Sequence, residues 1–132
     1  MKRILIIDDE PHMTHVLKLY LERAGYAVET APNGQAGLDS IIKSAPDVVV
    51  TDIQMPVMTG QQMCIKLEEV MPERTFPIFV MTSMTDREHR EWTQKINNLE
   101  FLEKPLSMRA LTNKLDIYFK QVETIGSVNH DK

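Results

Sequence analysis

Short apolar runs alternate with longer stretches of helical periodicity along most of the chain, and this alternation is the feature that most limits the possible folds. Runs such as "ILII" and "VVV" predict buried strands, whereas apolar residues three and four apart predict amphipathic helices. Because a helical stretch follows each strand, the strands should run parallel, with helices on both faces of the sheet. The predicted strands lie at 4–8, 26–31, 47–52, 77–83 and within 100–105. The expected fold class is therefore α/β with a five-stranded parallel sheet.

Each predicted helix has a recognisable start. Thr85 and Glu88, for example, fit a capping box, in which the two side chains bond each other's backbone N–H groups. Residues after about 121 lack helical periodicity, so we expect one domain over residues 1–121 and a disordered C-terminal tail over residues 122–132. The residues that begin or cap the predicted helices are Pro11, Asn33, Gly60, Thr85 and Ser107.

Size, charge and cysteine content narrow the class of protein. A chain of 132 residues suits one domain with a real core. Its net charge, 15 − 19 = −4, argues against direct binding of nucleic acid through the phosphates. The single cysteine, Cys64, cannot form an internal disulfide, which suits a reducing compartment. The apolar run at 4–7 is too short for a signal peptide and no later run could span a bilayer, so we expect a cytoplasmic location without membrane insertion.

The side chains that could take part in catalysis or ligand binding all lie where predicted strands end. In an open α/β sheet, the carboxyl ends of parallel strands share one edge, and ligands bind there at the topological switch point. Several such residues at one edge are stronger evidence for a site than any single motif. They are Asp8 and Asp9 after the first strand, Asp52 at the end of the third, Thr82 and Ser83 at the end of the fourth, and Lys104 just past the fifth.

Three carboxylates that converge on one crevice repel one another, and some are pushed toward the protonated form. A divalent cation relieves this repulsion. Oxygen ligands from a few carboxylates, with space for water, describe Mg²⁺ better than zinc. A carboxylate beside such a metal can act as a nucleophile toward phosphorus, while the metal and Lys104 neutralise charge that develops on the phosphoryl oxygens.

Five stretches of the chain resemble the bacterial two-component response-regulator receiver domain, of the single-domain, chemotaxis-regulator-like kind. The stretches cover residues 3 to about 119 in the usual order and spacing, which makes the combination specific. The resemblance implies a flavodoxin-like receiver fold with strand order 2-1-3-4-5. The matching stretches are "ILIIDDEP", "APNGQAGL", "PDVVVTDIQMPVMTG", "FVMTS" and "FLEKPL".

The resemblance also implies a role for each of the acidic residues. Asp52 would be the phosphoacceptor that becomes an aspartyl phosphate. Asp9 would bind Mg²⁺ directly and Asp8 mainly through water, while Asp52 and the backbone carbonyl of Gln54 would complete the protein ligands. A sensor histidine kinase or a histidine phosphotransfer protein would supply the phosphoryl group, as in a phosphorelay. The domain would catalyse only its own phosphorylation and dephosphorylation, so it would be a signalling switch and not an enzyme.

By the same resemblance, Thr82 would hydrogen-bond the phosphoryl group and Lys104 would pair with it. Phe101 would turn inward when Thr82 moves, and Pro105 would follow a cis peptide bond, which proline makes accessible. The surface of the helix after Thr85, the fifth strand and the last helix would then change shape by a population shift. An unidentified downstream protein would bind that surface. We expect a monomer or a weak, phosphorylation-dependent dimer.

The sequence departs from the receiver pattern in places. Asn97-Asn98 replaces the usual Gly-Ala before the fifth strand, although Asn tolerates the positive φ that a turn needs there. Gln54 and Met84 occupy the variable positions that tune the phosphoryl lifetime, and Phe101 lacks the hydroxyl that many receivers carry.

Two other functions would suit a similar sheet. A haloacid-dehalogenase-like phosphatase or phosphotransferase would also use an Asp nucleophile, but it needs a second Asp two residues later, where this chain has Gln54. A flavin-binding module would need a Ser/Thr/Gly-rich phosphate loop after the first strand, where this chain has "DDEPHM".

Several residues have plainer interpretations than the chemistry they suggest. His12 and His15 could notionally bind a metal, but without a third ligand we expect solvated surface side chains. Cys64 is predicted to be a small buried hydrophobe, and Met55 and Met58 to fill gaps in the packing.

Overall fold

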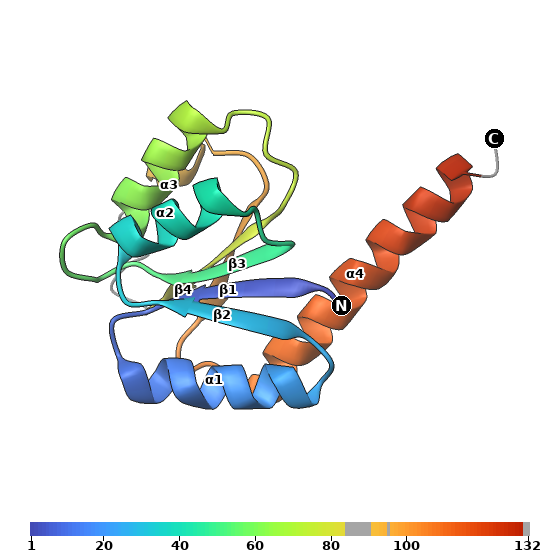
Figure 1. Cartoon of the computed structure of the whole chain (residues 1–132), viewed down its shortest axis with the longest axis horizontal. Helices are drawn as coiled ribbons and strands as arrows, with labels where there is room; N and C mark the ends of the chain where they lie inside the picture. Colours follow the sequence, from blue (N-terminus) through green and yellow to red (C-terminus); the bar gives the residue numbers. More distant parts are fainter. Residues whose placement is uncertain (84–90, 95, 131–132) are drawn as a thin grey trace.

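A parallel sheet of five strands runs through the centre of the molecule (Figure 1). The computed structural model describes residues 1–83, 91–94 and 96–130, with side chains up to Val122. The strand order is β2-β1-β3-β4-β5, so both the α/β class and the order expected from the resemblance are confirmed. The strands are β1 Arg3–Ile7, β2 Ala27–Ala31, β3 Val48–Asp52, β4 Ile78–Thr82 and β5 Leu99–Glu103.

Helices cover both faces of this sheet, as the sequence predicted. Helices α2 and α3 lie above the sheet in Figure 1 and pack on one face. Helix α1 lies below the sheet and shares the opposite face with the first half of α4. Among the described residues, none of the helices is long and apolar enough to cross a membrane. The helices are α1 Pro11–Arg23, α2 Gly34–Lys43, α3 Gly60–Val70 and α4 Met108–His130.

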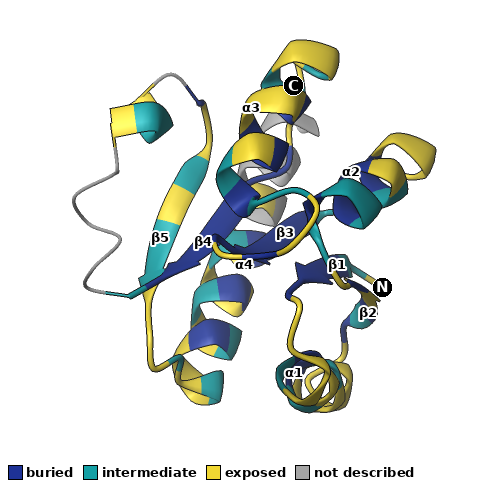
Figure 2. Cartoon of the chain, turned by 90° about the vertical axis from the view of Figure 1, so that its left-hand side faces the viewer, coloured by how far each residue is buried: buried dark blue, intermediate teal, exposed yellow. Residues whose placement is uncertain are grey.

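Successive side chains of each strand point to opposite faces, and this alternation divides the interior into two cores. Ile4 and Ile6 pack against α1 and α4, whereas Leu5 and Ile7 pack against α2 and α3. Every residue of β3 and β4 is buried, which Figure 2 shows as continuous dark strands in the middle of the sheet. The run of valines before Asp52 therefore reflects a central strand covered on both faces, and it carries no chemistry of its own.

Three helix starts can be checked in the structure. The Asn33 side chain accepts a hydrogen bond from the backbone N–H of Ala36, and the Ser107 hydroxyl accepts one from Ala110, so both predicted caps are confirmed. At the start of α3, the Thr59 and Gln62 side chains form a reciprocal capping box with each other's backbone.

The segment between β4 and β5 is only partly described. The predicted capping box at Thr85 and Glu88 lies outside the described residues, and residues 91–94 form a 3₁₀ turn. Asn98 has φ of 57°, so an asparagine of the Asn97-Asn98 pair adopts the positive φ that was expected in the turn before β5.

The structure corrects the predicted end of the last helix. The sequence favoured a disordered tail from residue 122, whereas α4 continues to His130 and extends past the end of the sheet (Figure 1). No proline interrupts the segment, and a lone glycine, Gly126, costs a helix only about 1 kcal/mol. Once a helix is formed, each further residue adds a hydrogen bond, so weak periodicity alone does not end it.

Candidate functional site

The carboxyl ends of β1 and β3 lie side by side and bring three aspartates together. Asp8 and Asp9 follow the last residue of β1, and Asp52 is the last residue of β3. Because Ile7 pairs with Thr51 in the parallel register, the two strand ends are level. Carboxylate oxygens of Asp8, Asp9 and Asp52 all lie within 4.8 Å of one another. The structure therefore contains the acidic cluster that the sequence predicted at this edge of the sheet.

Asp52 is held in place by two donors on the same oxygen. Its Oδ1 accepts a hydrogen bond of 2.9 Å from the Lys104 ammonium and one of 2.8 Å from the backbone N–H of Ile53. The residue is buried, with 8% of its surface exposed, whereas the Lys104 side chain is 41% exposed. A charge-assisted bond to a buried carboxylate is short and orients it well.

The start of α3 also fixes the backbone around Asp52. The N–H of Gly60 donates to the carbonyl of Ile53 over 2.8 Å. A Cβ at Gly60 would overlap the backbone oxygen of Asp52 and lie 3.1 Å from the carbonyl carbon of Asp52 and from the Cα of Ile53. This close approach requires glycine at the position.

Asp8 lies in surroundings that disfavour its charged form. It is 5% exposed, and its Oδ1 accepts a hydrogen bond of 3.0 Å from the backbone N–H of Glu10. Burial raises the pKa of Asp8, and the nearby Asp52 and Asp9 carboxylates raise it further, while the Glu10 N–H and Lys104 act in the opposite direction. The cluster therefore carries negative charge that the protein itself does not fully compensate.

The donor set fits a hard divalent cation. All three side chains of the cluster are carboxylates, and Asp9 is exposed, so water can reach one side of the cluster. Mg²⁺ prefers oxygen ligands and keeps several waters when it binds to proteins. Gln54 lies two residues beyond Asp52 in the loop after β3, where its backbone carbonyl remains a predicted ligand.

Thr82 and Lys104 reach the same edge from the other half of the sheet. The N–H of Lys104 donates to the carbonyl of Thr82 over 2.8 Å, which aligns the ends of β4 and β5. Thr82 is 1% exposed, and its hydroxyl donates to the carbonyl of Ser83 over 3.0 Å. Its predicted bond to a phosphoryl group would require this hydroxyl to change partners.

Phe101 lies on β5, opposite Val80 of β4 in the parallel register. Its ring is half-buried and packs against the core between the sheet and helices α2 and α3. The Lys104–Pro105 peptide bond is cis, which confirms that expectation. The switch role of Phe101 itself stays a prediction.

Some contacts at the site were not predicted from the sequence. Thr59 and Gln62 form a capping box that the T-x-x-Q pattern could have indicated. Val57 has φ of 66°, and the N–H of Met58 donates to the carbonyl of Pro56 over 2.7 Å, so the loop after Asp52 contains a γ-turn. Because a β-branched residue disfavours positive φ, no sequence signal pointed to this turn.

The plainer interpretations hold. His12 and His15 are exposed on α1 and lie outside the acidic cluster. Cys64 is fully buried, and burial raises the pKa of its thiol to about 12. Met55 belongs to the core between the sheet and helices α2 and α3, and Met58 packs against it.

Comparison with known families and proteins gives a consistent match. The family model described as "Response regulator receiver domain" matches residues 4–116. Protein PilH of Pseudomonas aeruginosa is 30% identical over 116 residues, which are 88% of this chain and 96% of that protein. The alkaline phosphatase synthesis transcriptional regulatory protein PhoP of Bacillus subtilis is 28% identical over 92% of this chain and 50% of its own length. The chain thus spans about half the length of the first transcriptional regulators it matches.

Solved structures agree with this match. The chemotaxis protein CheY4 of Vibrio cholerae is 29% identical with a TM-score of 0.79, over 88% of this chain and 97% of that one. The response regulator TrrA of Thermotoga maritima, crystallised in complex with Mg²⁺-BeF, is 28% identical with a TM-score of 0.76, over the same shares of the two chains.

Proposed function

The chain belongs to the response regulator receiver domain family, and we propose that Asp52 is the residue through which it accepts a phosphoryl group. As a receiver it is a signalling switch, with an acidic pocket typical of a phosphoacceptor site. The observation that carries the assignment is the position of Asp52, the one carboxylate of the cluster whose oxygen is bonded to Lys104, at 2.9 Å.

The donor in this proposal is a phosphohistidine of a sensor histidine kinase or a histidine phosphotransfer protein. An Asp52 carboxylate oxygen attacks the phosphorus, the P–N bond breaks, and the imidazole leaves. Lys104 offsets the negative charge on the phosphoryl oxygens, because its ammonium already lies within hydrogen-bond distance of Asp52. Attack of water on the same phosphorus later restores the carboxylate. The turnover is confined to the protein's own aspartate.

We also propose Mg²⁺ as the cation of the site. Asp9, Asp52 and the carbonyl of Gln54 would hold it directly, and Asp8 mainly through water. The converging carboxylates and the raised pKa of Asp8 support this assignment, because both indicate uncompensated negative charge. When bound, the cation supplies positive charge beside the phosphoryl oxygens.

In this proposal, phosphorylation changes the shape of one surface of the domain. Thr82 would move its hydroxyl toward the phosphoryl group, Phe101 would turn inward, and the surface formed by the segment after β4, by β5 and by α4 would bind a downstream protein. The domain over residues 1–121 would act as a monomer or a weak, phosphorylation-dependent dimer. A cytoplasmic location would give it access to the kinase.

Intact mass after incubation with Mg²⁺ and acetyl phosphate tests the central assignment. We expect a single phosphoryl adduct that Asp52→Asn abolishes. Asp39→Asn, an exposed aspartate on α2, is the matched control and should keep the adduct. An adduct that persists in Asp52→Asn would refute the assignment. Multiple turnover of an organic phosphomonoester would instead favour the haloacid-dehalogenase-like alternative, which Gln54 already argues against.

A further inference from the structure

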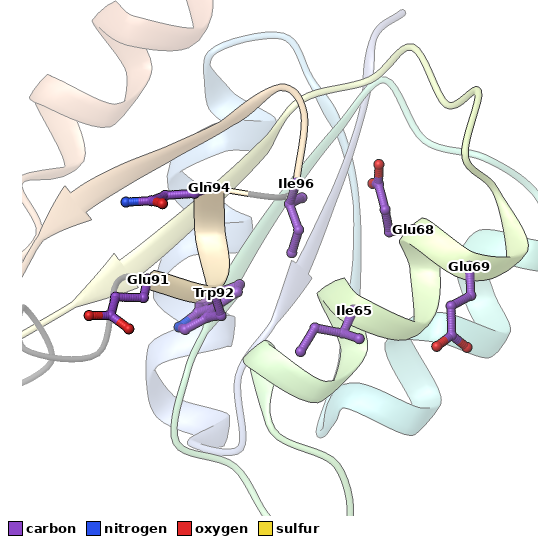
Figure 3. A pocket seen from close by; sticks show the side chains of 7 residues that line it. All are labelled: Ile65, Glu68, Glu69, Glu91, Trp92, Gln94 and Ile96. Atoms are coloured by element: carbon purple, nitrogen blue, oxygen red, sulfur yellow. The ribbon is translucent and has the colours of Figure 1, made fainter.

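A second concave surface lies on the flank of α3, and none of the phosphoacceptor-site residues lines it. Side chains of α3 form one wall, and side chains from residues 91–94 and 96 form the other (Figure 3). The volume of this groove is about 770 Å³, within the range of sites that hold a ligand or an anchoring side chain. We call it the acidic groove; it is lined by Ile65, Glu68, Glu69, Glu91, Trp92, Gln94 and Ile96.

Apolar side chains lie on both walls of the acidic groove. Ile65 is 41% exposed although it is a large aliphatic residue, and Trp92 on the facing wall is half-buried. Ile96, 8% exposed, joins the groove to the core below. Apolar surface that is concave and bordered by polar groups marks an interaction site more often than isolated exposed residues do.

The charged residues that line the groove, within the described part of the chain, are all carboxylates. Arg74 approaches Glu68 to 3.8 Å, but its side chain is 2% exposed and its guanidinium donates to the carbonyls of Phe76 and Asn97. Its charge is therefore directed into the protein. Lys66 pairs with Glu69 at 3.6 Å, and both side chains are more than half exposed, so a partner can displace this weak pair.

We propose that the acidic groove docks an amphipathic helix of a partner protein, with an apolar stripe flanked by lysine or arginine. Ile65, Glu68 and Glu69 occupy positions i, i+3 and i+4 of α3 and so present one apolar and acidic face. A helix that lies along this face places its apolar stripe between α3 and Trp92, and its cations meet the rim carboxylates.

The partner is a different protein and not a second copy of this chain. Helices α1, α2 and α3 and the first half of α4 use their apolar stripes in the two cores of their own molecule. The part of α4 that extends past the sheet, residues 120–130, has one lysine and one glutamate, so it lacks the flanking cations that the groove requires. The groove shares no residue with the acidic cluster, and its α3 wall lies outside the surface that we propose to change on phosphorylation.

A pair of synthetic helical peptides tests the proposal on the full chain. The probe carries leucines at positions i, i+4 and i+7 with lysines on both flanks, and the control peptide has glutamate in place of every lysine. Trp92 is the single tryptophan, so its emission reports on the groove directly. We expect the lysine peptide to bind about tenfold more tightly or better, with affinity that falls as salt rises. Amide shifts in NMR spectra should concentrate in α3 and residues 91–96.

Matched variants locate the binding surface. Ile65→Ser should weaken the lysine peptide about tenfold, and Glu69→Lys should weaken it about fivefold. Ile42→Ser, an isoleucine on α2 that is 56% exposed, and Glu22→Lys on α1 are the controls and should change nothing. Equal affinity for the two peptides would overturn the proposal. Equal effects of Ile65→Ser and Ile42→Ser, or self-association through α3 in light scattering, would also overturn it.

Discussion

Gly60→Ala tests directly whether the packing of α3 against β3 positions the proposed phosphoacceptor, Asp52. The new Cβ would overlap the carbonyl oxygen of Asp52 and crowd the backbone of Ile53. These neighbours are backbone atoms of a central strand end, so no side-chain rotation can relieve the overlap. Either α3 or the end of β3 must move, and both movements displace the Asp52 carboxylate.

The expected cost follows from two opposing effects. Overpacking costs up to about 3 kcal/mol when the surroundings resist, and an alanine within a helix regains up to about 1 kcal/mol over glycine. We therefore expect the free energy of unfolding to fall by about 2 kcal/mol, measured by urea denaturation and circular dichroism. The initial rate of phosphorylation by acetyl phosphate should fall by about tenfold or more, because a small misplacement of a reacting group is costly.

Gly25→Ala is the matched control for this prediction. Gly25 has φ of 101°, and a Cβ added there would meet nothing within 4 Å beyond its chain neighbours, so only backbone strain opposes the substitution. We expect a loss of about 1–2 kcal/mol in stability and an unchanged rate of phosphorylation. A Gly60→Ala protein that unfolds at the wild-type urea concentration and phosphorylates at the wild-type rate would refute the reasoning.

Three further predictions concern single residues. Lys104→Ala should slow acetyl phosphate-dependent phosphorylation by about 100-fold and change the free energy of unfolding by less than about 1 kcal/mol, because the lysine is partly exposed; a large stability loss with normal phosphorylation would contradict its proposed role. The pKa of Asp8 in the folded protein is raised above the unfolded value of 3.8. Asp8 therefore stabilises the fold when it is protonated, below pH 3.8, and this contribution to the free energy of unfolding is lost as pH rises through the folded pKa. Asp8→Asn should therefore be more stable than wild type at pH 7 without Mg²⁺ in urea denaturation, and a difference that does not shrink toward pH 4 would exclude this cause. Val57→Gly should raise the unfolding free energy by about 1 kcal/mol, since glycine accepts positive φ and the valine is 81% exposed; an unchanged urea midpoint would show that the turn is unstrained.

Much of the site could be predicted because it depends on local patterns and on one geometric rule. Apolar runs indicate where strands lie, and polar residues indicate where they end. In a parallel sheet the carboxyl ends share an edge, so Asp8 and Asp52 had to be near each other once β1 and β3 were neighbours. Periodicity does not say which strands are neighbours, and the strand order was taken from the resemblance.

The remaining contacts depend on three-dimensional detail that patterns do not contain. Nothing in the sequence distinguishes Gly60, which touches the backbone of Asp52, from a glycine that only begins a helix. The side chain of Arg74 is buried although arginine is usually exposed, because its guanidinium donates to two carbonyls from segments far apart in sequence. The length of α4 was also missed, since helix propagation continues where amphipathic periodicity is weak.

The hydrogen bond of Thr82 sets a limit on how far phosphorylation alone could move the proposed switch. Its hydroxyl now donates to the Ser83 carbonyl, a neutral bond with a net value of about 1 kcal/mol, and a bond to a charged phosphoryl oxygen has a value of about 1.5–3 kcal/mol. The exchange gains at most about 2 kcal/mol, which is roughly a 30-fold change in population. A complete shift from 1:99 to 99:1 requires about 10⁴-fold. Lys104 adds only part of the remainder, because it already bonds Asp52 before phosphorylation. A downstream protein that binds only the shifted packing would have to supply the rest.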